Sequence, residues 1–260
     1  MTRRSFLDRR AFTLLELLAV IIVIAILASL LIPAFSAVQR SADKTKCASN
    51  LRQVGAAIAA YVGEHDGYLP GPLWSWQEPY YCDADYGTLA AVLEKYLKLP
   101  SQPSCGPRAN KPRADVFVCP AWLRNHPYST AAGDPWQIYI LNSQVNVTCG
   151  NTVTPINPWG DALIVYQNSG TTSPDPYAGD KPRPVSALPD KDNDDKVRSA
   201  STIWAIQDYD LDLTRAPTCP RLSTDPNYSP QFIAPHPVHG NVRNTLFFDW
   251  HVEPVKVTTQ

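Results

Sequence analysis

The acidic side chains that could hold a metal ion gather in two short runs in the second half of the chain. In each run the carboxylates stand at alternate positions, as they do in calcium-binding loops: Asp190, Asp192 and Asp194, then Asp208, Asp210 and Asp212. The first run has Asp195 and Ser201 where an EF-hand loop needs Gly and Glu, so it is not an EF-hand. A solvated acidic loop is the default interpretation of both runs, and calcium binding stays an open alternative.

A third group near the C-terminus contains histidine. His239, Asp249 and His251 could form a metal or proton-transfer site. An ordinary half-buried sheet edge with polar turn residues has the same pattern, and we favour it. The chain also lacks Gly-x-Ser-x-Gly, P-loop, His-Glu-x-x-His and dinucleotide-binding motifs. We therefore predict no enzyme, no catalytic residue, no metal site and no cofactor apart from the calcium alternative.

Six cysteines are spread along the chain without any Cys-x-x-Cys spacing: Cys47, Cys82, Cys105, Cys119, Cys149 and Cys219. This spacing argues against a zinc ribbon or a redox motif. An even number of cysteines outside the cytoplasm favours disulfides, with the connectivity left open. Cys105 and Cys119 enclose a short loop and are the first pair to expect, whereas free buried cysteines are the alternative.

The stretch that must position the rest of the chain lies near the N-terminus. From Leu17 to Ile32 no residue is charged, and the Ser29 hydroxyl is the only polar side chain. With its apolar flanks the stretch reaches about 20 residues, which is enough to cross a bilayer as a helix. Glu16 stands within this apolar run, where a carboxylate costs about 2.5–3.5 kcal/mol and needs a partner and a function.

The residues before the apolar stretch set its orientation. Four arginines, Arg3, Arg4, Arg9 and Arg10, precede it, so this end is expected in the cytoplasm and the following domain outside it. A cleaved signal peptide is the competing interpretation. It is disfavoured because the apolar core is long and because large apolar residues follow the weak cleavage site at Ala28-Ser-Leu30.

The segment Arg10-Ala11-Phe12-Thr-Leu-Leu-Glu16 resembles the processing site of type IV prepilins and type II secretion pseudopilins. The resemblance implies that a prepilin peptidase cuts between Ala11 and Phe12 and methylates the new amine of Phe12. It also implies that Glu16 serves assembly, and it includes Pro33 at the usual place in the helix. Ala11 stands where the family usually has Gly, which is expected to slow cleavage.

The charges at this site suggest how subunits would assemble. Cleavage would leave an ammonium at Phe12, which the Glu16 carboxylate of a neighbouring subunit could neutralise inside lipid. Such a pair would fix the register of stacked helices in a filament. A plain membrane anchor with an acid near the headgroups is the alternative.

The helix is expected to continue beyond the membrane. Leu51, Val54, Ile58 and Tyr61 form an apolar stripe at helical spacing. Only Pro33 interrupts the pattern between Phe12 and Val62, so one helix of about 50 residues is predicted. Its first half would lie in lipid or in a filament core, and its second half would pack on the globular domain.

Further pieces resemble a large pilin-like family of unknown function with a C-terminal His-x9-Asp-Gly motif. The matching segments are Asn50–Gly55, Tyr61, Asp66–Pro70, Val116–Pro120, Tyr139–Asn142 and the pair His239 and Asp249. Trp250 replaces the Gly of the motif. If that Gly serves a turn with positive φ, Trp250 must use another turn or accept strain.

The predicted fold is therefore α+β and pilin-like. A long N-terminal transmembrane helix packs on a C-terminal globular domain rich in antiparallel strands and long loops. The expected divisions are a leader (1–11), a transmembrane half-helix (12–35), an exposed amphipathic half-helix (36–63) and the globular domain (64–260). Expected strands are Val116–Val118, Ile138–Leu141, Ala162–Tyr166, Thr202–Ile206, Thr245–Phe248 and Val252–Val257, with one short helix at Thr88–Leu97.

Two other segments carry expectations. Trp74, Trp76, Tyr80 and Tyr81 lie close together in the sequence, and core packing under loops is preferred to a partner- or glycan-binding surface. Residues 167–200 are rich in Pro and Gly and then charged, so they are predicted to form an exposed excursion.

The predicted function is that of a pilin-like subunit in an envelope filament, with type II secretion-like export as the favoured role. Its partners would be prepilin peptidase, other pilin-like subunits and the inner membrane, with the globular domain periplasmic or extracellular. The net charge is −1 and no basic run follows Arg40, so nucleic acid is not an expected partner. The alternative is a membrane-anchored periplasmic enzyme or glycan-binding domain that uses the helix only as an anchor.

Overall fold

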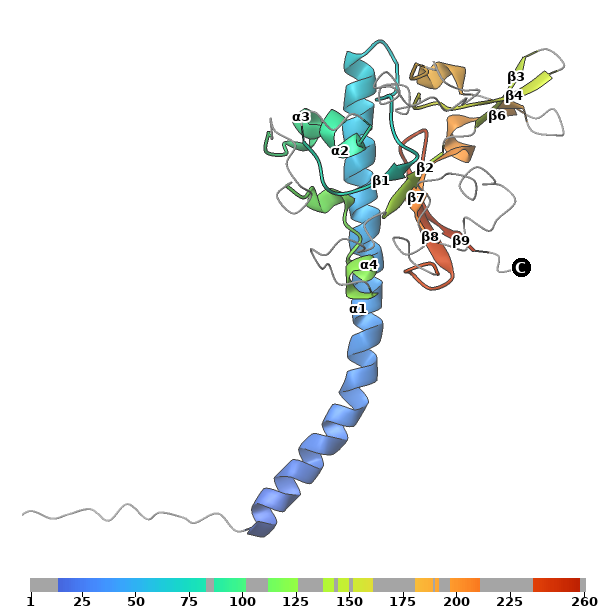
Figure 1. Ribbon diagram of the computed structural model, residues 1–260. Coiled ribbons are helices and arrows are strands. Elements are labelled where there is room, and N and C mark those ends of the chain that lie inside the picture. Colours follow the sequence, from blue (N-terminus) through green and yellow to red (C-terminus); the bar gives the residue numbers. More distant parts are fainter. Residues whose placement is uncertain are drawn as a thin grey trace, which may run out of the picture. The chain divides into compact units, whose positions relative to one another are not determined.

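The computed structural model describes residues 14–82, 87–101, 112–125, 138–142, 145–149, 152–160, 181–188, 190–191, 197–210 and 236–257. The chain divides into two compact units, Met1–Ala42 and Asp43–Gln260. Helix α1 (Leu14–Glu64) begins in the first unit and ends in the second (Figure 1). In the part of the chain that the structure describes, α1 is the one helix long and apolar enough to cross a membrane.

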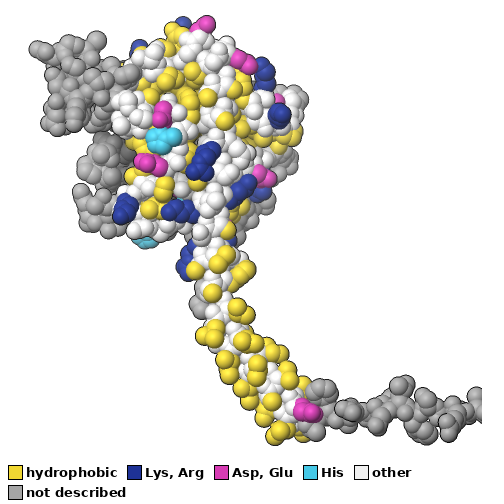
Figure 2. All heavy atoms as spheres, turned by 180° about the vertical axis from the view of Figure 1, so that it is seen from behind, with side chains coloured by type: hydrophobic (Ala, Val, Ile, Leu, Met, Phe, Trp, Pro, Cys, Tyr) yellow, Lys and Arg dark blue, Asp and Glu magenta, His cyan; other side chains and the backbone are white. Residues whose placement is uncertain are grey.

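The N-terminal part of α1 exposes its apolar side chains on all sides. Leu14 is 88% exposed and Val38 is 65% exposed, and the large apolar residues between them are similarly open. Figure 2 shows hydrophobic side chains covering this part of the helix. Since apolar side chains all around a helix are typical of a segment that lies in lipid or against partner helices, the first unit has the surface of a membrane anchor.

The C-terminal part of α1 belongs to the core of the second unit. Leu51, Val54 and Ile58 of the predicted stripe are buried, and Tyr61 is half-buried. Gly55 lies against strand β8 (Val242–Phe247), because a Cβ at this position would stand 2.8 Å from Leu246 Cδ1. The long helix and its buried stripe are therefore confirmed.

The main sheet has five antiparallel strands in the order β1–β2–β7–β8–β9 (Figure 1). Besides β8, its strands are β1 (Trp76–Gln77), β2 (Tyr139–Leu141), β7 (Trp204–Asp208) and β9 (Val252–Lys256). Strands β7 and β8 pair with a register shift between Trp204 and Ile206. An α+β fold with a long N-terminal helix and an antiparallel sheet is thus confirmed.

Short helices and 3₁₀ turns complete the described part of the second unit: α2 (Leu89–Val92), α3 (Glu94–Leu97), η2 (Asp115–Phe117), α4 (Pro120–Asn125), η3 (Val185–Ala187) and η4 (Ala200–Thr202). Some of them contact α1 through polar groups as well as through the core. Asn50 Nδ2 donates to the Val118 carbonyl oxygen at 2.9 Å, and Glu64 accepts from Lys95 Nζ at 3.0 Å and from the Tyr96 hydroxyl at 2.8 Å. These contacts fix the C-terminal part of α1 to the segments that follow it.

Two small hairpin-like sheets were not expected from the sequence. Strands β3 (Val145–Cys149) and β4 (Thr152–Ile156) pair with each other, and so do β5 (Asp190–Lys191) and β6 (Val197–Arg198). The predicted exposed excursion at 167–200 therefore contains paired strands, and its Leu188 is buried. Residues 167–180, 189 and 192–196 of that excursion lie outside the described residues.

Several strand and helix predictions need correction. Val116–Val118 is wrong as a strand, because Asp115–Phe117 forms the 3₁₀ turn η2 and buries Phe117. The helix predicted at Thr88–Leu97 is divided into α2 and α3 at Leu93, which is fully buried. The strand predicted at Thr202–Ile206 begins two residues later, since Ala200–Thr202 forms the 3₁₀ turn η4. The strand predicted at Ala162–Tyr166 lies outside the described residues.

The turn between β8 and β9 resolves the question raised by Trp250. The Trp250 backbone has φ = 71°, in the left-handed region, and its N–H donates to the Phe247 carbonyl at 2.9 Å. The turn therefore keeps the geometry that suits Gly, and Trp250 accepts the strain.

The aromatic residues at 74–81 divide between core and surface. Tyr81 is fully buried, and its hydroxyl donates to the Pro100 carbonyl at 2.8 Å. Trp74 and Trp76 stack with their ring centroids 5.6 Å apart and, like Tyr80, stay half-buried. The expected core packing holds for Tyr81 and in part for the other three residues.

Candidate functional site

The residues predicted from the N-terminal motif fall at the start of the first unit. Glu16 lies in the first turn of α1 and is exposed among apolar side chains. Ala11 and Phe12, the predicted cleavage and methylation positions, lie outside the described residues. The helix continues through Pro33, and the Ser29 hydroxyl donates to the carbonyl oxygen of Ile26 at 2.7 Å within its own helix.

The structure separates the three residues of the predicted C-terminal group. Asp249 and His251 pair with each other in the β8–β9 turn, where His251 also stacks on Phe247 with centroids 4.4 Å apart. His239 lies in the turn before β8 and is directed into the second unit. The favoured interpretation, polar residues at a sheet edge, therefore holds for Asp249 and His251, while His239 belongs elsewhere.

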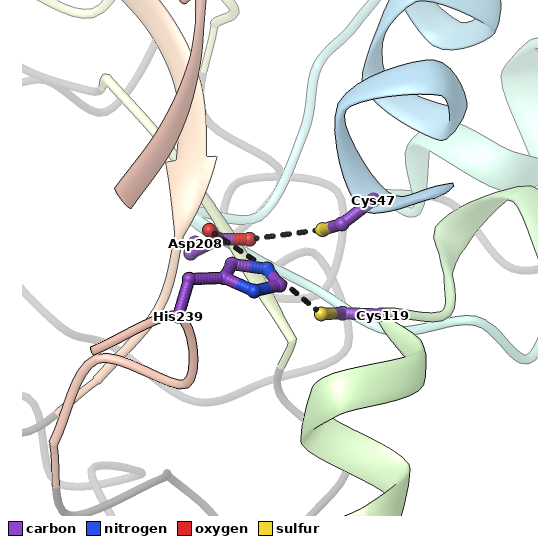
Figure 3. Close-up of side chains that lie close together, drawn as sticks. All are labelled: Cys47, Cys119, Asp208 and His239. Atoms are coloured by element: carbon purple, nitrogen blue, oxygen red, sulfur yellow. Dashed lines mark hydrogen bonds and ion pairs between the residues drawn. The ribbon is translucent and has the colours of Figure 1, made fainter. Parts of the chain in front are cut away.

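His239 meets three residues that no motif in the sequence connects with it (Figure 3). Cys47 comes from α1, Cys119 from the residue before α4, and Asp208 from the last residue of β7. One donor atom from each of the four side chains lies within 4.8 Å of all the others. We call these four residues, Cys47, Cys119, Asp208 and His239, the interior cluster.

The contacts inside the interior cluster are short. Cys119 Sγ lies 3.3 Å from His239 Nε2, and Cys47 Sγ lies 3.3 Å from Asp208 Oδ1. The same Nε2 atom of His239 is 3.6 Å from Asp208 Oδ2. The side chains of Asp208 and His239 are 3% and 1% exposed, and both cysteines are fully buried. Two thiols, a carboxyl and an imidazole therefore converge on one point that water does not reach.

Neighbouring groups hold these side chains in place. The Tyr139 hydroxyl, from β2, lies 3.2 Å from Cys47 Sγ, and the Asn244 backbone N–H, from β8, donates to Asp208 Oδ2 at 2.8 Å. Asp43, one helical turn before Cys47, forms an ion pair with Arg124 of α4 at 2.8 Å. This ion pair ties the segments that carry the two cysteines.

Proximity changes the pKa values of the interior cluster. Burial raises the pKa of Cys119, but hydrogen bonds from Cys47 and His239 outweigh it and bring that pKa to about 5. Burial, and then the hydrogen bond with Cys119, raise the pKa of Cys47 well above its ordinary value. Burial, and then the negative charge of Cys119, raise the pKa of Asp208 to about 7.

The pKa of the imidazole in the interior cluster is raised as well. Burial alone would lower the pKa of His239, but the hydrogen bond with Cys119 and the charge of Asp208 raise it. The lowered pKa of Cys119 and the raised pKa of His239 each shift the group toward its charged form.

The disulfide expectation is corrected by the same residues. Cys47 and Cys119 are not in disulfides, so the pair Cys105–Cys119 is wrong. The reason is that Cys119 is directed at His239 and Cys47 in the interior. Cys82 does form a disulfide, and Cys105 and Cys219 lie outside the described residues.

The structure assigns different partners to the acids of the second run. Asp208 belongs to the interior cluster, whereas Asp210 accepts two hydrogen bonds from Arg243, at 2.6 and 2.7 Å. Asp212, and Asp192 and Asp194 of the first run, lie outside the described residues. Because Arg243 neutralises Asp210 and Asp208 faces two thiols, these two carboxylates do not form a calcium loop.

Sequence reasoning missed Cys47, Cys119 and Asp208 as partners of His239 because no local spacing connects them. Cys119 and His239 are 120 residues apart in the chain, and Cys47 and Asp208 are 161 apart. The available signal was indirect: an even number of cysteines without a regular motif, and a histidine in the His-x9-Asp arrangement.

Comparison with known proteins defines the class of the N-terminal segment. Residues 7–32 match the family model of the prokaryotic N-terminal methylation motif. The chain therefore carries a prepilin-type N-terminal methylation segment, as its resemblance to prepilins and pseudopilins predicts, joined to an α+β unit.

A second comparison finds similarity over a longer segment. The chain is 38% identical over 64 residues to the ComG operon protein 3 homolog of Bacillus licheniformis. The match covers 25% of this chain and 66% of that protein, so the chain spans just under two thirds of the relative's length. No solved structure matches the chain.

Proposed function

We propose that this chain is a pilin-like subunit that is cut between Ala11 and Phe12, methylated at Phe12 and assembled through α1 into an envelope filament. The observation that carries the proposal is the coincidence of the methylation motif at residues 7–32 with a helix whose apolar side chains are exposed. A plain membrane anchor would explain the apolar helix. It would not explain the proposed processing site or the acid Glu16 within the apolar run.

The proposed assembly rests on charge pairing inside the membrane. The ammonium at Phe12 of one subunit would meet the Glu16 carboxylate of its neighbour, because each charge alone is costly in a low dielectric. The other partners are prepilin peptidase and further pilin-like subunits. We place the chain in the inner membrane as a single-pass protein, with the leader in the cytoplasm and the second unit periplasmic or extracellular.

The role proposed for the second unit is structural. It would give subunit contacts and partner specificity, and type II secretion-like export is the system that we favour. The interior cluster does not offer a nucleophile to a substrate, because both of its thiols are buried. This burial supports a subunit rather than an anchored enzyme.

The first experiment is mass spectrometry of the N-terminal peptide of the native protein. A peptide that begins at N-methylated Phe12 would support the proposal. A chain that begins at Met1 would contradict it, since the helix would then be a plain anchor.

Assembly is tested with two variants of α1. Glu16→Ala removes the proposed charge pair and is expected to abolish filament formation, while Ser29→Ala is the matched control because that hydroxyl bonds within its own helix. Filaments are scored by electron microscopy and by cross-linking in membranes. Equal assembly of both variants would count against the pairing of Phe12 with Glu16.

A further inference from the structure

We propose that Cys47, Cys119, Asp208 and His239 bind one zinc ion as a closed structural site. This inference goes beyond the filament function and does not depend on it. The four residues come from α1, the residue before α4, the end of β7 and the turn before β8, so an ion among them would join four separate segments of the second unit.

The distances within the interior cluster suit a tetrahedral ion. Bonds of about 2.0–2.3 Å to zinc place neighbouring ligand atoms about 3.3–3.8 Å apart at the corners of a tetrahedron. The contact between Cys119 Sγ and His239 Nε2, at 3.3 Å, falls on this scale. The two oxygens of Asp208 lie at similar distances from other donors, Oδ1 at 3.3 Å from Cys47 Sγ and Oδ2 at 3.6 Å from His239 Nε2. With one oxygen of Asp208 as its ligand atom, the four ligand atoms all lie within 4.8 Å of one another. A small inward movement of the side chains would therefore complete the coordination.

The donor atoms select the metal. Two sulfurs, one imidazole nitrogen and one carboxylate oxygen form a borderline-soft set that suits zinc. Calcium and magnesium prefer six or more oxygens, so they do not fit two thiols. Four protein donors leave no position for water or substrate, as in structural rather than catalytic zinc sites.

The burial of the interior cluster favours the binding of a cation. A carboxyl, an imidazole and two thiols share an interior point, with side chains no more than 3% exposed. Ionised groups in the interior need compensating charge, and a divalent cation supplies it at the point where they converge. The Tyr139 hydroxyl at Cys47 and the Asn244 N–H at Asp208 have the positions of the outer hydrogen bonds that orient metal ligands.

The arrangement argues against a catalytic relay. In a Cys-His-Asp relay the two ring nitrogens divide the work, one facing the nucleophile and the other facing the acid. Here the same Nε2 of His239 faces both Cys119 Sγ and Asp208 Oδ2. A ring nitrogen in this position can bind the same metal ion as the thiol and the carboxyl.

The direct test is the metal content of the full-length chain. The protein is purified in detergent, incubated with zinc chloride, desalted and measured by mass spectrometry of the elements. We expect about one zinc per chain in the parent and a loss of this zinc in His239→Ala. His251→Ala is the matched control and should keep the zinc, because His251 lies in the exposed turn with Asp249. A parent that binds no zinc, or a His239→Ala variant that binds as much as the parent, would overturn the proposal.

Two further measurements test the zinc site without the His239→Ala variant, in case that variant does not fold. The parent loaded with Co²⁺ should show the visible absorption of a tetrahedral ion with a thiolate charge-transfer band, whereas the weak spectrum of octahedral cobalt would overturn the site. Tyr139→Phe removes only the hydroxyl at Cys47 and should lower the zinc affinity by about 10- to 100-fold in competition with a chelator. An unchanged affinity would contradict the outer hydrogen bond that we assign to Tyr139.

The oxidation state of Cys47 and Cys119 distinguishes a zinc site from a disulfide between these two residues. Peptide mapping of the native protein should find Cys47 and Cys119 protected from alkylation until a chelator is added. A disulfide between Cys47 and Cys119 in the native protein would overturn the proposal, since neither sulfur could then serve as a thiolate ligand.

Discussion

Asp208 and Asp210 stand two residues apart in the chain but have different charge partners. Asp208 faces the other members of the interior cluster, whereas the carboxylate of Asp210 receives two hydrogen bonds from the Arg243 guanidinium. The side chains of Asp210 and Arg243 are 1% and 11% exposed. Removing one partner of a buried ion pair lowers the free energy of unfolding, because the opposite charge that stabilised the other partner is lost.

Arg243→Met tests this pair. The variant leaves the Asp210 carboxylate in the interior without its guanidinium, and we expect the free energy of unfolding to fall by about 3–5 kcal/mol. Urea unfolding of the full-length chain in detergent, followed by tryptophan fluorescence, measures the loss.

The double variant Arg243→Met with Asp210→Asn is the control for the charge. It also removes the charge of the carboxylate that has lost the Arg243 guanidinium, so part of the lost stability should return. If the double variant is no more stable than Arg243→Met alone, the charge of Asp210 without the Arg243 guanidinium is not the cause.

Helix α1 meets β8 at a glycine, and the close approach explains why this residue is small. A Cβ at Gly55 would stand 2.8 Å from Leu246 Cδ1 and 3.4 Å from the Trp250 carbonyl oxygen. Leu246 is fully buried, so its side chain has little room to move away. A Cβ at Gly63, further along the same helix, would have no heavy atom within 4 Å.

Gly55→Val is therefore expected to overpack the contact between helix and sheet. We expect its free energy of unfolding to fall by about 1–3 kcal/mol. Gly63→Val is the matched control on the same helix and should leave stability unchanged or slightly higher, because Val has the better helix propensity. Thermal unfolding of both variants measures the difference, and equal changes would show that the close contact with Leu246 does not decide stability.

The end of α1 is held to α3 by a charge-assisted contact. The Glu64 carboxylate accepts from Lys95 Nζ at 3.0 Å and from the Tyr96 hydroxyl at 2.8 Å. The hydrogen bonds from Lys95 and then from Tyr96 lower the pKa of Glu64, and burial with the Glu64 hydrogen bond raises the pKa of Tyr96 to about 12.

This contact should depend on pH in one direction. A lowered pKa in the folded state means that Glu64 stabilises the fold above its unfolded pKa, and that this contribution is lost as the pH falls through the folded value. The parent should therefore melt above Glu64→Gln near neutral pH, and the difference should disappear in acid. Melting curves over a pH series measure it, and a difference that grows on acidification would contradict the assignment.

In the described part of the chain, the hydrophobic core belongs to the second unit, which begins at Asp43. Every buried apolar residue found in the described part of the chain lies at Cys47 or beyond. The exposed large apolar residues of α1 run from Leu14 to Val38, in the first unit. Hydrophobic burial is the main stabilising term in folding. We therefore expect residues 43–260 to contain the apolar contacts that stabilise the second unit.

A fragment of residues 43–260 is expected to fold without detergent and to melt within a few degrees of the full-length chain. Its solubility follows from the loss of the apolar helix surface. Size-exclusion chromatography and circular dichroism check this, and an aggregated or unfolded fragment would show that residues before Asp43 contribute to the fold.

The amino-acid sequence by itself determined the features that depend on neighbouring residues. The methylation segment is a short continuous motif, and α1 follows from an apolar run and a stripe at helical spacing. Strands β2 and β9 were predicted within one residue at each end, since local alternation and turn residues mark them. The strand predicted at Val116–Val118 failed because a short apolar run also suits a buried 3₁₀ turn.

Only the tertiary structure decided which distant side chains meet. Cys119 and His239 are 120 residues apart and Cys47 and Asp208 are 161 apart, so neither pair leaves a spacing that the sequence alone would show. Their meeting depends on the packing of α1 and α4 against the ends of β7 and β8. The same packing left Cys119 facing His239 instead of Cys105. Local patterns report the period of a helix or strand, whereas a site built from four segments exists only once those segments are packed together.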